Sequence, residues 1–437
     1  MSLYPDQLKA AADFEEWLTY GTDTTAGLWA SAGYGKSYCV KHLITEVVRN
    51  SKYNALVTSM THSAVAVLSD FTGMPVQTLH SLMGWIPHVD KDTGEESLST
   101  PKQRDRNAKS ALDPSSLVIV DEAGLLGHTE LKYLLRECAE TGARVLFVGD
   151  SKQCYPVMKD TDKLCIPAYD ATECMMELTE PKRVDEKDVI FKLSQAFRAT
   201  VDGARQPKLR TVMVEGKGVT IVDDIEDAAC DAFMAAENRR MVKVLAFTNQ
   251  RCLTLNRKIR KRVLGVKDQT PLVGEEMVAN TSIEDATREN VIIRNNQLVI
   301  VKSVEPTESF GLQGSFIQFV DLDGEEIPET VFVASTTALL NSRLKDLANA
   351  ASKAREEGDK EASSKYWRAY FSLKESVADV RFTYAMTVNK AQGTTLNHVL
   401  VDLWDINACH DESQKARLAY TAVTRATNLV TIEGELT

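Results

Sequence analysis

The sequence lacks the features that would mark it as a membrane, secreted or metal-binding protein. Its 437 residues contain no uninterrupted apolar run near the roughly 18 residues that a membrane span needs. Residues 1–7 show no basic stretch leading into an apolar core, so we expect no secretory signal. The eight cysteines form no Cys-x-x-Cys pair, and the seven histidines add no metal-ligand spacing. These absences predict a cytoplasmic protein with buried or free thiols and no zinc.

An excess of basic charge is also missing. Lys and Arg number 51 against 62 Asp and Glu, which gives a formal net charge of −11. A protein that wraps or coats nucleic acid neutralises many phosphates, so the acidic balance argues against that class. It does not exclude an enzyme with a narrow basic groove, because the local potential rather than the net charge governs contact.

The first half of the sequence has the pattern of an α/β domain. Hydrophobic residues make up 43% and charged residues 26%, and the length suits about two to four domains. In residues 1–185 apolar runs alternate with amphipathic stretches, which predicts α/β structure with a mainly parallel sheet. The expected elements are a helix over 6–19 and strands near 26–31, 54–59, 116–120 and 144–149. A polar stretch within residues 86–114 predicts a small surface insertion with a hairpin around Asp92-Thr93-Gly94.

The second half predicts another α/β domain that is interrupted by an insertion. The α/β pattern occupies residues 186–264 and 380–437, with a helix over 187–200 and a strand over 243–247. Residues 265–379 differ: short apolar runs break at Asn-Asn and Asp-Gly, which indicates antiparallel hairpins. A charged helical stretch over 338–377 follows, interrupted near Gly358, and predicts a helical hairpin.

The strongest local pattern follows the expected strand at 26–31. Residues 30–37 read Ala-Ser-Ala-Gly-Tyr-Gly-Lys-Ser, and they depart from the P-loop pattern G-x-x-x-x-G-K-[ST] only at Ala30. Backbone N–H groups of such a turn, at the start of a helix, bind a phosphate chain. Lys36 is then predicted to reach the β- and γ-phosphates, and Ser37 to hold Mg²⁺. The loop that would hold ATP consists of Ala30, Ser31, Ala32, Gly33, Tyr34, Gly35, Lys36 and Ser37.

Two carboxylates, Asp121 and Glu122, end the apolar run Leu117 to Val120. We expect Asp121 to bind Mg²⁺ through water and Glu122 to polarise the attacking water. A carboxylate pair after a strand is also common on protein surfaces. The preceding P-loop favours the catalytic interpretation.

A third polar segment, residues 149–153, follows the strand expected at 144–149. An amide side chain beside a γ-phosphate can report by hydrogen bonding whether that phosphate is present. Gln153 is therefore predicted to contact the γ-phosphate, and a plain turn that closes the strand is the alternative.

These segments and six others stand in an order that resembles the helicase motifs of superfamily 1. The nine segments read GYGKS, VTSMTHSA, TLHSLMG, VIVDEAG, VGDSKQCYP, ELTEPKRVD, LAFTNQ, VNKAQGTT and LAYTAVTRAT. Within superfamily 1 the sequence most resembles the 1B group of RecD-like and Dda-like helicases. The resemblance runs from Gln7 to about Thr431. The resemblance implies two RecA-like domains with ATP between them, a pin-like insertion in the first, and a β-barrel with a helical arm inserted in the second.

The resemblance also implies further nucleotide contacts. Gln7 matches a glutamine that reads adenine, and Gln392 falls in a segment that contacts ATP. Arg183 and Arg425 match two arginines that approach the γ-phosphate. Guanidinium groups from the second domain stabilise the transition-state charge only when the cleft closes, which would couple hydrolysis to movement.

The family marks a path for single-stranded DNA as well. Short polar side chains suit a strand that is gripped and released in every cycle, since they add little salt-dependent affinity. For His62 and His80, a helix cap or a buried histidine is the alternative. The residues matched to DNA contacts are Thr61, His62, Thr78, His80, Ser81, Thr248, Asn249, Asn389 and Lys390.

Aromatic platforms for stacking bases are less clear from the sequence. Tyr155, Trp85, Trp367 and Tyr370 are candidates, although core packing is the favoured role for each. The insertion within 86–114 contains no Phe, Tyr or Trp, so the sequence does not identify a strand-separating residue.

The resemblance implies an ATP- and Mg²⁺-dependent helicase that moves 5′ to 3′ on single-stranded DNA and opens forked duplex. We expect a monomer that serves phage replication, recombination or repair in the host cytoplasm, with a single-strand-binding or replication protein as a further partner. The alternatives are an RNA helicase of the same superfamily and an ATP-driven switch that remodels protein on DNA without unwinding. A P-loop kinase would not explain Gln153, Arg425 and the second α/β unit together.

Overall fold

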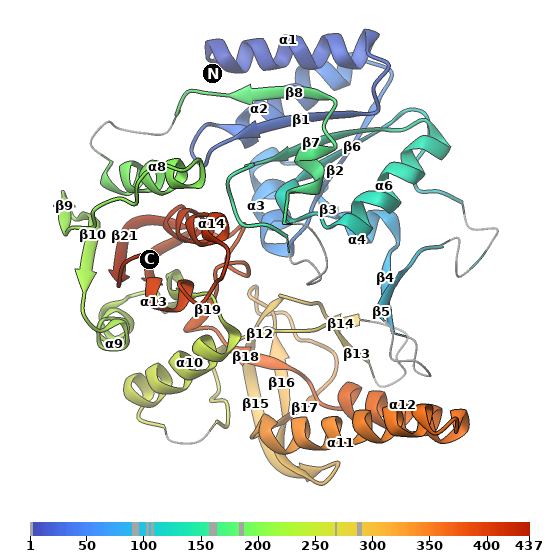
Figure 1. Cartoon of the computed structure of the whole chain (residues 1–437), viewed down its shortest axis with the longest axis vertical. Helices are drawn as coiled ribbons and strands as arrows, with labels where there is room; N and C mark the ends of the chain where they lie inside the picture. Colours follow the sequence, from blue (N-terminus) through green and yellow to red (C-terminus); the bar gives the residue numbers. More distant parts are fainter. Residues whose placement is uncertain are drawn as a thin grey trace. The chain divides into compact units, whose positions relative to one another are not determined.

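The structure is a computed structural model that describes residues 3–89, 96–101, 105, 109–156, 164–182, 188–266, 269–285 and 291–437 (Figure 1). By compactness the chain divides into two units. The first comprises Met1–Ile86, Thr100–Cys252 and Met386–Thr437, and the second comprises Pro87–Ser99 and Leu253–Ala385. In the described part of the chain, no helix has both the length and the apolar character that crossing a bilayer requires.

The first unit contains a six-stranded sheet of parallel strands, in the order β3-β2-β6-β7-β1-β8. The strands expected near 26–31, 54–59, 116–120 and 144–149 are confirmed within one residue. Both faces of a parallel sheet are covered, so its strands read as continuous apolar runs, and β1 is buried along its whole length. The strands are β1 (Thr25–Ala30), β2 (Asn54–Ser59), β3 (Gln77–Thr78), β6 (Ser116–Asp121), β7 (Arg144–Gly149) and β8 (Cys174–Leu178).

Helices pack on this sheet and connect its strands. In α1, Pro5 occupies the first turn, where its fixed φ suits a helix start. Ala10, Phe14 and Trp17 then form a buried apolar face against the sheet core. The helices are α1 (Pro5–Tyr20), α2 (Lys36–His42), α3 (His62–Thr72), α4 (Leu79–Met83), α6 (His128–Thr141) and α7 (Pro167–Asp170), with a π turn at Leu43–Val47 and 3₁₀ turns at Val48–Asn50 and Ala123–Leu125.

A second six-stranded sheet lies in the same unit, in the order β19-β11-β20-β21-β10-β9. Its strands come from both sides of the inserted segment. Helix α14 packs on it with Gln414 to Val423 all buried. Its elements are α8 (Val189–Val201), β9 (Val212–Val214), β10 (Lys217–Val222), α9 (Ile225–Ala235), a 3₁₀ turn (Arg239–Met241), β11 (Val242–Ala246), β19 (Ala385–Thr387), β20 (Leu396–Asp402), α13 (Leu403–Ile406), α14 (Glu412–Val423) and β21 (Ala426–Glu433).

The second unit is built on a five-stranded antiparallel sheet, in the order β17-β16-β15-β12-β18. The helical hairpin expected over 338–377 is confirmed as α11 and α12, and Gly358 lies between them with a φ of +82°. Two short strand pairs, β4 with β5 and β13 with β14, complete the unit. The elements that lie wholly or mostly in this unit are β4 (Ile86–Val89), β5 (Glu96–Ser99), α10 (Asn249–Leu264), β12 (Glu276–Ala279), β13 (Ile283–Glu284), β14 (Val291–Ile293), β15 (Leu298–Ser309), β16 (Leu312–Val320), β17 (Val331–Ala334), α11 (Thr337–Glu356), α12 (Lys360–Glu375) and β18 (Val380–Phe382).

The hairpin expected around Asp92-Thr93-Gly94 has its flanking strands in place. Strands β4 and β5 form a two-stranded sheet, while the turn residues lie outside the described part of the chain. Residues 87–99 cluster by compactness with the inserted segment rather than with the sheet that precedes them in the sequence.

The hairpin expected at Asn295-Asn296 is wrong. Asn296 does take a left-handed φ of 61°, but the strands on either side enter different sheets, since β14 pairs with β13 and β15 pairs with β12 and β16. The tight turn of this region is Phe310-Gly311 instead. Both residues have positive φ, 54° and 67°, and Ser309 pairs with Leu312 across them. Such a two-residue turn matches the right-handed twist of the strands.

Candidate nucleotide and nucleic-acid site

The phosphate loop lies between β1 and α2, at the carboxyl end of the parallel sheet. Gly33 and Gly35 both have left-handed φ values, 83° and 82°. The φ of Gly35 favours glycine, and a Cβ there would also lie 2.6 Å from Nε2 of Gln7 and force that side chain to move. Lys36 starts α2, and its Nζ donates to the carbonyls of Ala30 at 2.8 Å and Ser31 at 3.3 Å. The sequence-predicted loop thus has the backbone of a phosphate cradle, with its lysine folded over it.

Side chains and backbone groups of two distant segments contact the outside of this loop, and the sequence did not reveal these contacts. Gln7 is buried, accepts from Tyr4 N at 3.2 Å and donates to Gly35 O at 3.4 Å. Lys182 donates its backbone N–H to Gly33 O, and its Nζ lies 2.7 Å from Asp6. Burial alone would raise the pKa of Asp6, but Lys182 and two backbone N–H groups hold it below its usual value. Lys182 precedes Arg183 in the segment that matches a helicase motif. A lysine in the sequence does not indicate that its side chain will be buried against Asp6.

The carboxylate pair lies at the end of β6. Glu122 has φ 52° and ψ 39°, a left-handed conformation that is strained for a side chain of this size and is typical of functional sites. Burial and the charge of Glu122 raise the pKa of Asp121 to about 7, although Lys36 acts in the opposite direction. A hydroxyl at Ser37 and a carboxylate at Asp121 are oxygen ligands of the kind that Mg²⁺ prefers. In the described residues, no cluster of three or more His, Cys, Asp or Glu forms a further metal site.

The loop after β7 brings two predicted residues together. Gln153 is 3% exposed, and its Oε1 accepts from Nε2 of Gln392 at 2.9 Å. Gln153 follows the first sheet and Gln392 belongs to the second half of the chain. A buried amide pair therefore joins the two RecA-like halves at the segments that the sequence assigned to ATP.

Helix α14 binds the same loop through a row of side chains. Arg417 donates Nη1 to Ser151 O at 2.6 Å and to Gln153 O at 2.9 Å. The Arg417 guanidinium also lies 4.2 Å from the ring centroid of Tyr155, which places Tyr155 in packing rather than on a DNA path. Gln414 accepts from Tyr155 N, and Thr421 accepts from Cys154 N.

Arg425 follows α14 and is 7% exposed. Its Nη1 lies 3.5 Å from Thr394 O and its Nη2 lies 3.1 Å from Thr424 Oγ1. Its Nε is buried and has no hydrogen-bond partner within the described residues. A buried guanidinium with a donor to spare fits a phosphate ligand. Arg183, the second arginine predicted for this role, lies outside the described residues.

The first-half residues matched to DNA lie at two helix starts. Thr61 caps α3 by accepting from Ala64 N, and Thr78 caps α4 by accepting from Ser81 N. Burial lowers the pKa of His80, although Glu130, at 4.0 Å, acts to raise it. His62 is the first residue of α3. The second half approaches here, since a Cβ on Gly393 would lie 3.2 Å from Oγ1 of Thr61.

The second-half residues follow β11 and β19. Asp405 holds Thr248, a contact that the sequence did not reveal. Its Oδ2 accepts the N–H groups of Phe247 and Thr248, and its Oδ1 accepts the Thr248 hydroxyl at 2.8 Å. Asn249 starts α10, and Asn389 and Lys390 lie in the turn after β19.

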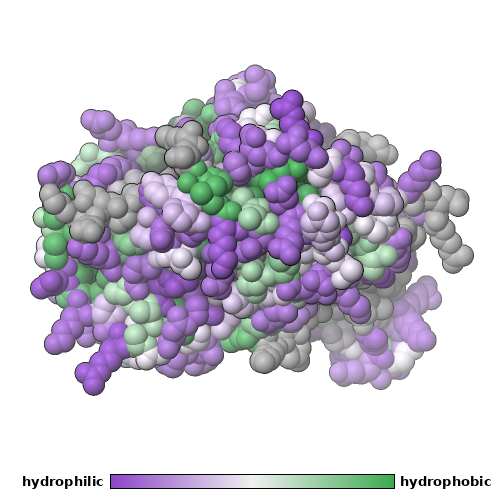
Figure 2. Space-filling view, turned by 90° about the horizontal axis from the view of Figure 1, so that it is seen from above, coloured by the Kyte–Doolittle hydropathy of each residue, from purple (hydrophilic) through white to green (hydrophobic). Residues whose placement is uncertain are grey.

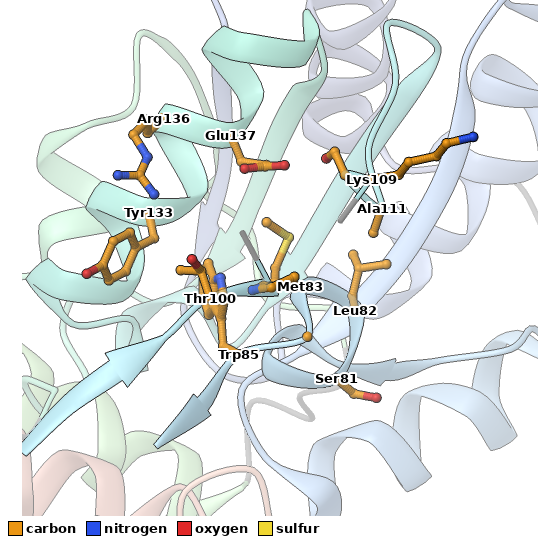
Figure 3. Close-up of a pocket in the computed structure, with 13 residues that line it drawn as sticks. Ser81, Leu82, Met83, Trp85, Thr100, Lys109, Ala111, Tyr133, Arg136 and Glu137 are labelled. Carbon is orange, nitrogen blue, oxygen red and sulfur yellow. The ribbon is translucent and has the colours of Figure 1, made fainter. Parts of the chain in front are cut away.

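Three further aromatic candidates lie in packed clusters. Trp85 is 5% exposed and lines a cavity of about 130 Å³ between α4 and α6, beside Tyr133 and the Arg136 guanidinium (Figure 3). Trp367 and Tyr370 are half-buried on α12 and pack against one another and Phe371. These contacts favour the packing role over base stacking.

Comparison with known proteins matches two family models to the chain. The AAA domain model matches residues 2–212, and the UvrD-like helicase C-terminal domain model matches residues 382–432. The ATP-dependent DNA helicase dda of Enterobacteria phage T4 is 26% identical over 428 residues, covering 90% of this chain and 91% of that protein.

A solved structure shares the fold. A Pif1 helicase, from a study of DNA unwinding at forked duplexes by two coordinating copies, matches 99% of this chain and 92% of its own with a TM-score of 0.52 and 16% identity. The Candida albicans Pif1 helicase covers 99% of this chain and 94% of its own with a TM-score of 0.47 and 16% identity.

The chain thus combines a phosphate loop, a carboxylate pair and two RecA-like sheets joined at buried glutamines, and in this it is similar to P-loop helicases. The chain is similar to the Dda helicase, and this likeness is consistent with the 1B group of superfamily 1.

Proposed function

We propose that the protein is an ATP-dependent DNA helicase that moves 5′ to 3′ along single-stranded DNA and opens forked duplex. The observation that carries the proposal is the junction of the two RecA-like halves, where Gln153 bonds Gln392 and Arg425 keeps a buried donor unpaired among the described residues. Residues that read a nucleotide are thereby tied to both halves, as a motor requires. The similar proteins include a DNA helicase and a Pif1 helicase studied at forked DNA, which supports DNA as the substrate.

The phosphate loop, the carboxylate pair and the arginines have proposed roles in hydrolysis. The N–H groups of residues 31–37 and the Lys36 amine would bind the phosphates of ATP, and Ser37 and Asp121 would hold Mg²⁺, which supplies charge neutralisation when bound. Glu122 orients water and accepts its proton. Arg425, with Arg183 as its proposed companion, stabilises the charge that develops during phosphoryl transfer.

The remaining assignments concern the DNA path and the cell. Thr61, Thr78, Thr248 and their neighbours at the helix starts are proposed to contact the sugar-phosphate backbone. The two RecA-like domains are proposed to span 1–185 and 186–264 with 380–437, interrupted by residues 265–379. A monomeric cytoplasmic enzyme of phage DNA replication, recombination or repair is the proposed setting, with a single-strand-binding or replication protein as its partner.

The test is Mg²⁺-dependent ATP hydrolysis with oligo-dT, with oligo-rU and with no nucleic acid. We expect oligo-dT to stimulate turnover at least tenfold and oligo-rU to stimulate it much less. Duplexes with a 5′ or a 3′ tail then give the direction, and only the 5′-tailed substrate should open. Equal stimulation by RNA would replace the DNA assignment with an RNA helicase, and stimulated turnover without unwinding would favour a switch that remodels protein.

Lys36→Ala supplies the blank for this assay. The hydrogen bonds that the described structure gives Lys36 go to two carbonyls of its own loop, so we expect its loss to remove nucleotide binding without disturbing the fold. We expect turnover below 1% of wild type and single-strand affinity within about threefold, measured by fluorescence anisotropy. A variant with near-normal turnover would contradict the assignment of the site.

A further inference from the structure

Tyr420 lies on α14 and is completely buried. Its hydroxyl donates to Oδ2 of Asp150 at 2.6 Å, and the backbone N–H of Ala32 donates to the same hydroxyl at 3.3 Å. Ala32 belongs to the phosphate loop and Asp150 begins the loop that carries Gln153. One hydroxyl of the second RecA-like half therefore joins two nucleotide segments of the first.

The direction of these two bonds follows from the chemistry of the phenol. Burial, and then the nearby Asp150 carboxylate, raise the pKa of Tyr420 well above its usual value, so the hydroxyl keeps its proton. Its single proton is used on Asp150, the stronger acceptor. The phenol oxygen is then left as an acceptor for the Ala32 N–H.

Tyr420 continues the row by which α14 grips the loop after β7. Gln414, Arg417 and Thr421 are spaced three or four residues apart and all contact residues 151–155. Tyr420 extends the row to the phosphate loop itself. Arg425 follows five residues later, so a displacement of α14 at Tyr420 would also displace the arginine that is proposed to contact the γ-phosphate.

We propose that Tyr420 is a positioning residue that couples the phosphate loop to α14, and through α14 to Arg425. The inference rests on the proposed function and deepens it. The N–H groups of a phosphate loop are donors for phosphate oxygens, so the phenol oxygen of Tyr420 competes with a bound phosphate for the Ala32 N–H. The hydrogen bond from Ala32 N–H to Tyr420 then depends on whether a phosphate occupies the phosphate loop. The hydrogen bond to Asp150 keeps the phenol oriented in both cases.

Tyr420→Phe isolates the hydroxyl, because the ring stays in its buried site. Tyr155→Phe is the matched control, since it removes a hydroxyl of the same helix-loop contact, 3.4 Å from Ser413, which does not reach the phosphate loop. Both variants are first checked by circular dichroism and thermal unfolding. We expect both to fold, with Tyr420→Phe less stable because Asp150 loses a buried donor.

The decisive readout is single-strand affinity with and without a non-hydrolysable ATP analogue, which needs no turnover. Wild type and Tyr155→Phe should change affinity by about fivefold or more when the analogue binds, within the usual range of coupling between sites. In Tyr420→Phe the change should fall below twofold, while affinity for fluorescent ADP stays within threefold. The kcat for DNA-stimulated hydrolysis should fall at least tenfold with little change in KM for ATP.

A second variant tests the pair. Asp150→Asn weakens the acceptor without removing the side chain, and Tyr420→Phe combined with Asp150→Asn should be no worse than the poorer single variant, because both act through one contact. Normal affinity switching and a kcat within twofold in Tyr420→Phe would overturn the proposal, as would equal losses in Tyr155→Phe. The proposed function is judged separately, by oligo-dT stimulation of the wild-type enzyme.

Discussion

Arg425 is a buried charged side chain whose hydrogen bonds are incomplete. Its guanidinium is nearly buried, yet Nε has no partner in the part of the chain that the structure describes. An unsatisfied buried donor costs about 1–3 kcal/mol. The fold tolerates that cost at an arginine that is proposed to contact the γ-phosphate, and a charged ligand would satisfy the unpaired donor.

Arg425→Ala should therefore separate binding from hydrolysis. We expect ATP affinity to stay within about threefold and the hydrolysis rate to fall by about 10³ or more, because the lost guanidinium acts mainly on the transition state. Arg425→Lys keeps the charge but not the planar fork, and should recover only part of the rate. Single-turnover kinetics and nucleotide titration check this. A loss under tenfold in Arg425→Ala would place the arginine outside the reaction.

At the scale of one element, strand β20 carries a titratable side chain into the second sheet. His398 contacts Thr431 on β21 at 2.9 Å, and Thr431 in turn contacts Thr220 on β10 at 2.8 Å. Burial lowers the pKa of His398 to about 4. The unfolded chain, with an ordinary histidine pKa of about 6.5, takes up the proton first.

Acid should therefore weaken this sheet. The contribution of His398 is fully present above about pH 6.5 and is lost as the pH falls toward 4. Because the side chain is partly exposed, we expect a loss of about 1 kcal/mol in unfolding free energy between pH 7.5 and 5. His398→Gln should show a smaller loss over the same range, as measured by urea unfolding. An identical pH dependence in the two proteins would exclude this histidine as the cause.

Elements differed in how well the sequence predicted them. The buried parallel strands were predicted within a residue, because burial on both faces leaves a continuous apolar run. The hairpin at Asn295-Asn296 was wrong, since asparagine marks a left-handed residue but does not fix which strands pair. The turn at Phe310-Gly311 was missed because phenylalanine rarely adopts positive φ and gives no turn signal.

The candidate site divides in the same way. The phosphate loop and the carboxylates are local patterns, so the sequence alone predicts them as a nucleotide site. Lys182 beside Asp6, Asp405 beside Thr248 and Tyr420 beside Asp150 are contacts between distant segments. No local spacing encodes such contacts, so only the folded chain reveals these positioning side chains.

At the scale of the whole molecule, acidity and the chemistry of the DNA path agree. The net charge is −11, and hydrophilic side chains cover most of the face shown in Figure 2, with hydrophobic side chains in smaller groups. Of the residues proposed to contact DNA, Lys390 alone is formally cationic at neutral pH. Binding should thus rely on short polar donors rather than on charge.

Salt should consequently affect DNA affinity only weakly. For single strands, log K falls with log salt by about 0.7 for every phosphate neutralised. We expect a slope no steeper than about −2, and Lys390→Ala should reduce it by about 0.7. Fluorescence anisotropy titrations at salt concentrations from about 50 to about 300 mM provide the slope. A value near −6 would reveal a basic groove that the proposed contacts omit.

The order of strands in the second sheet also has a consequence for synthesis of the protein. All six strands of the first sheet lie before residue 179, whereas β20 and β21, central in the second sheet, come after residue 395. Chains emerge from the ribosome N-terminus first, and domains generally fold as units in that order. The first sheet can form around its phosphate loop before β20 and β21, the two strands that lie between β11 and β10, have been synthesised. During translation the phosphate loop can therefore be folded before Arg425 has been synthesised.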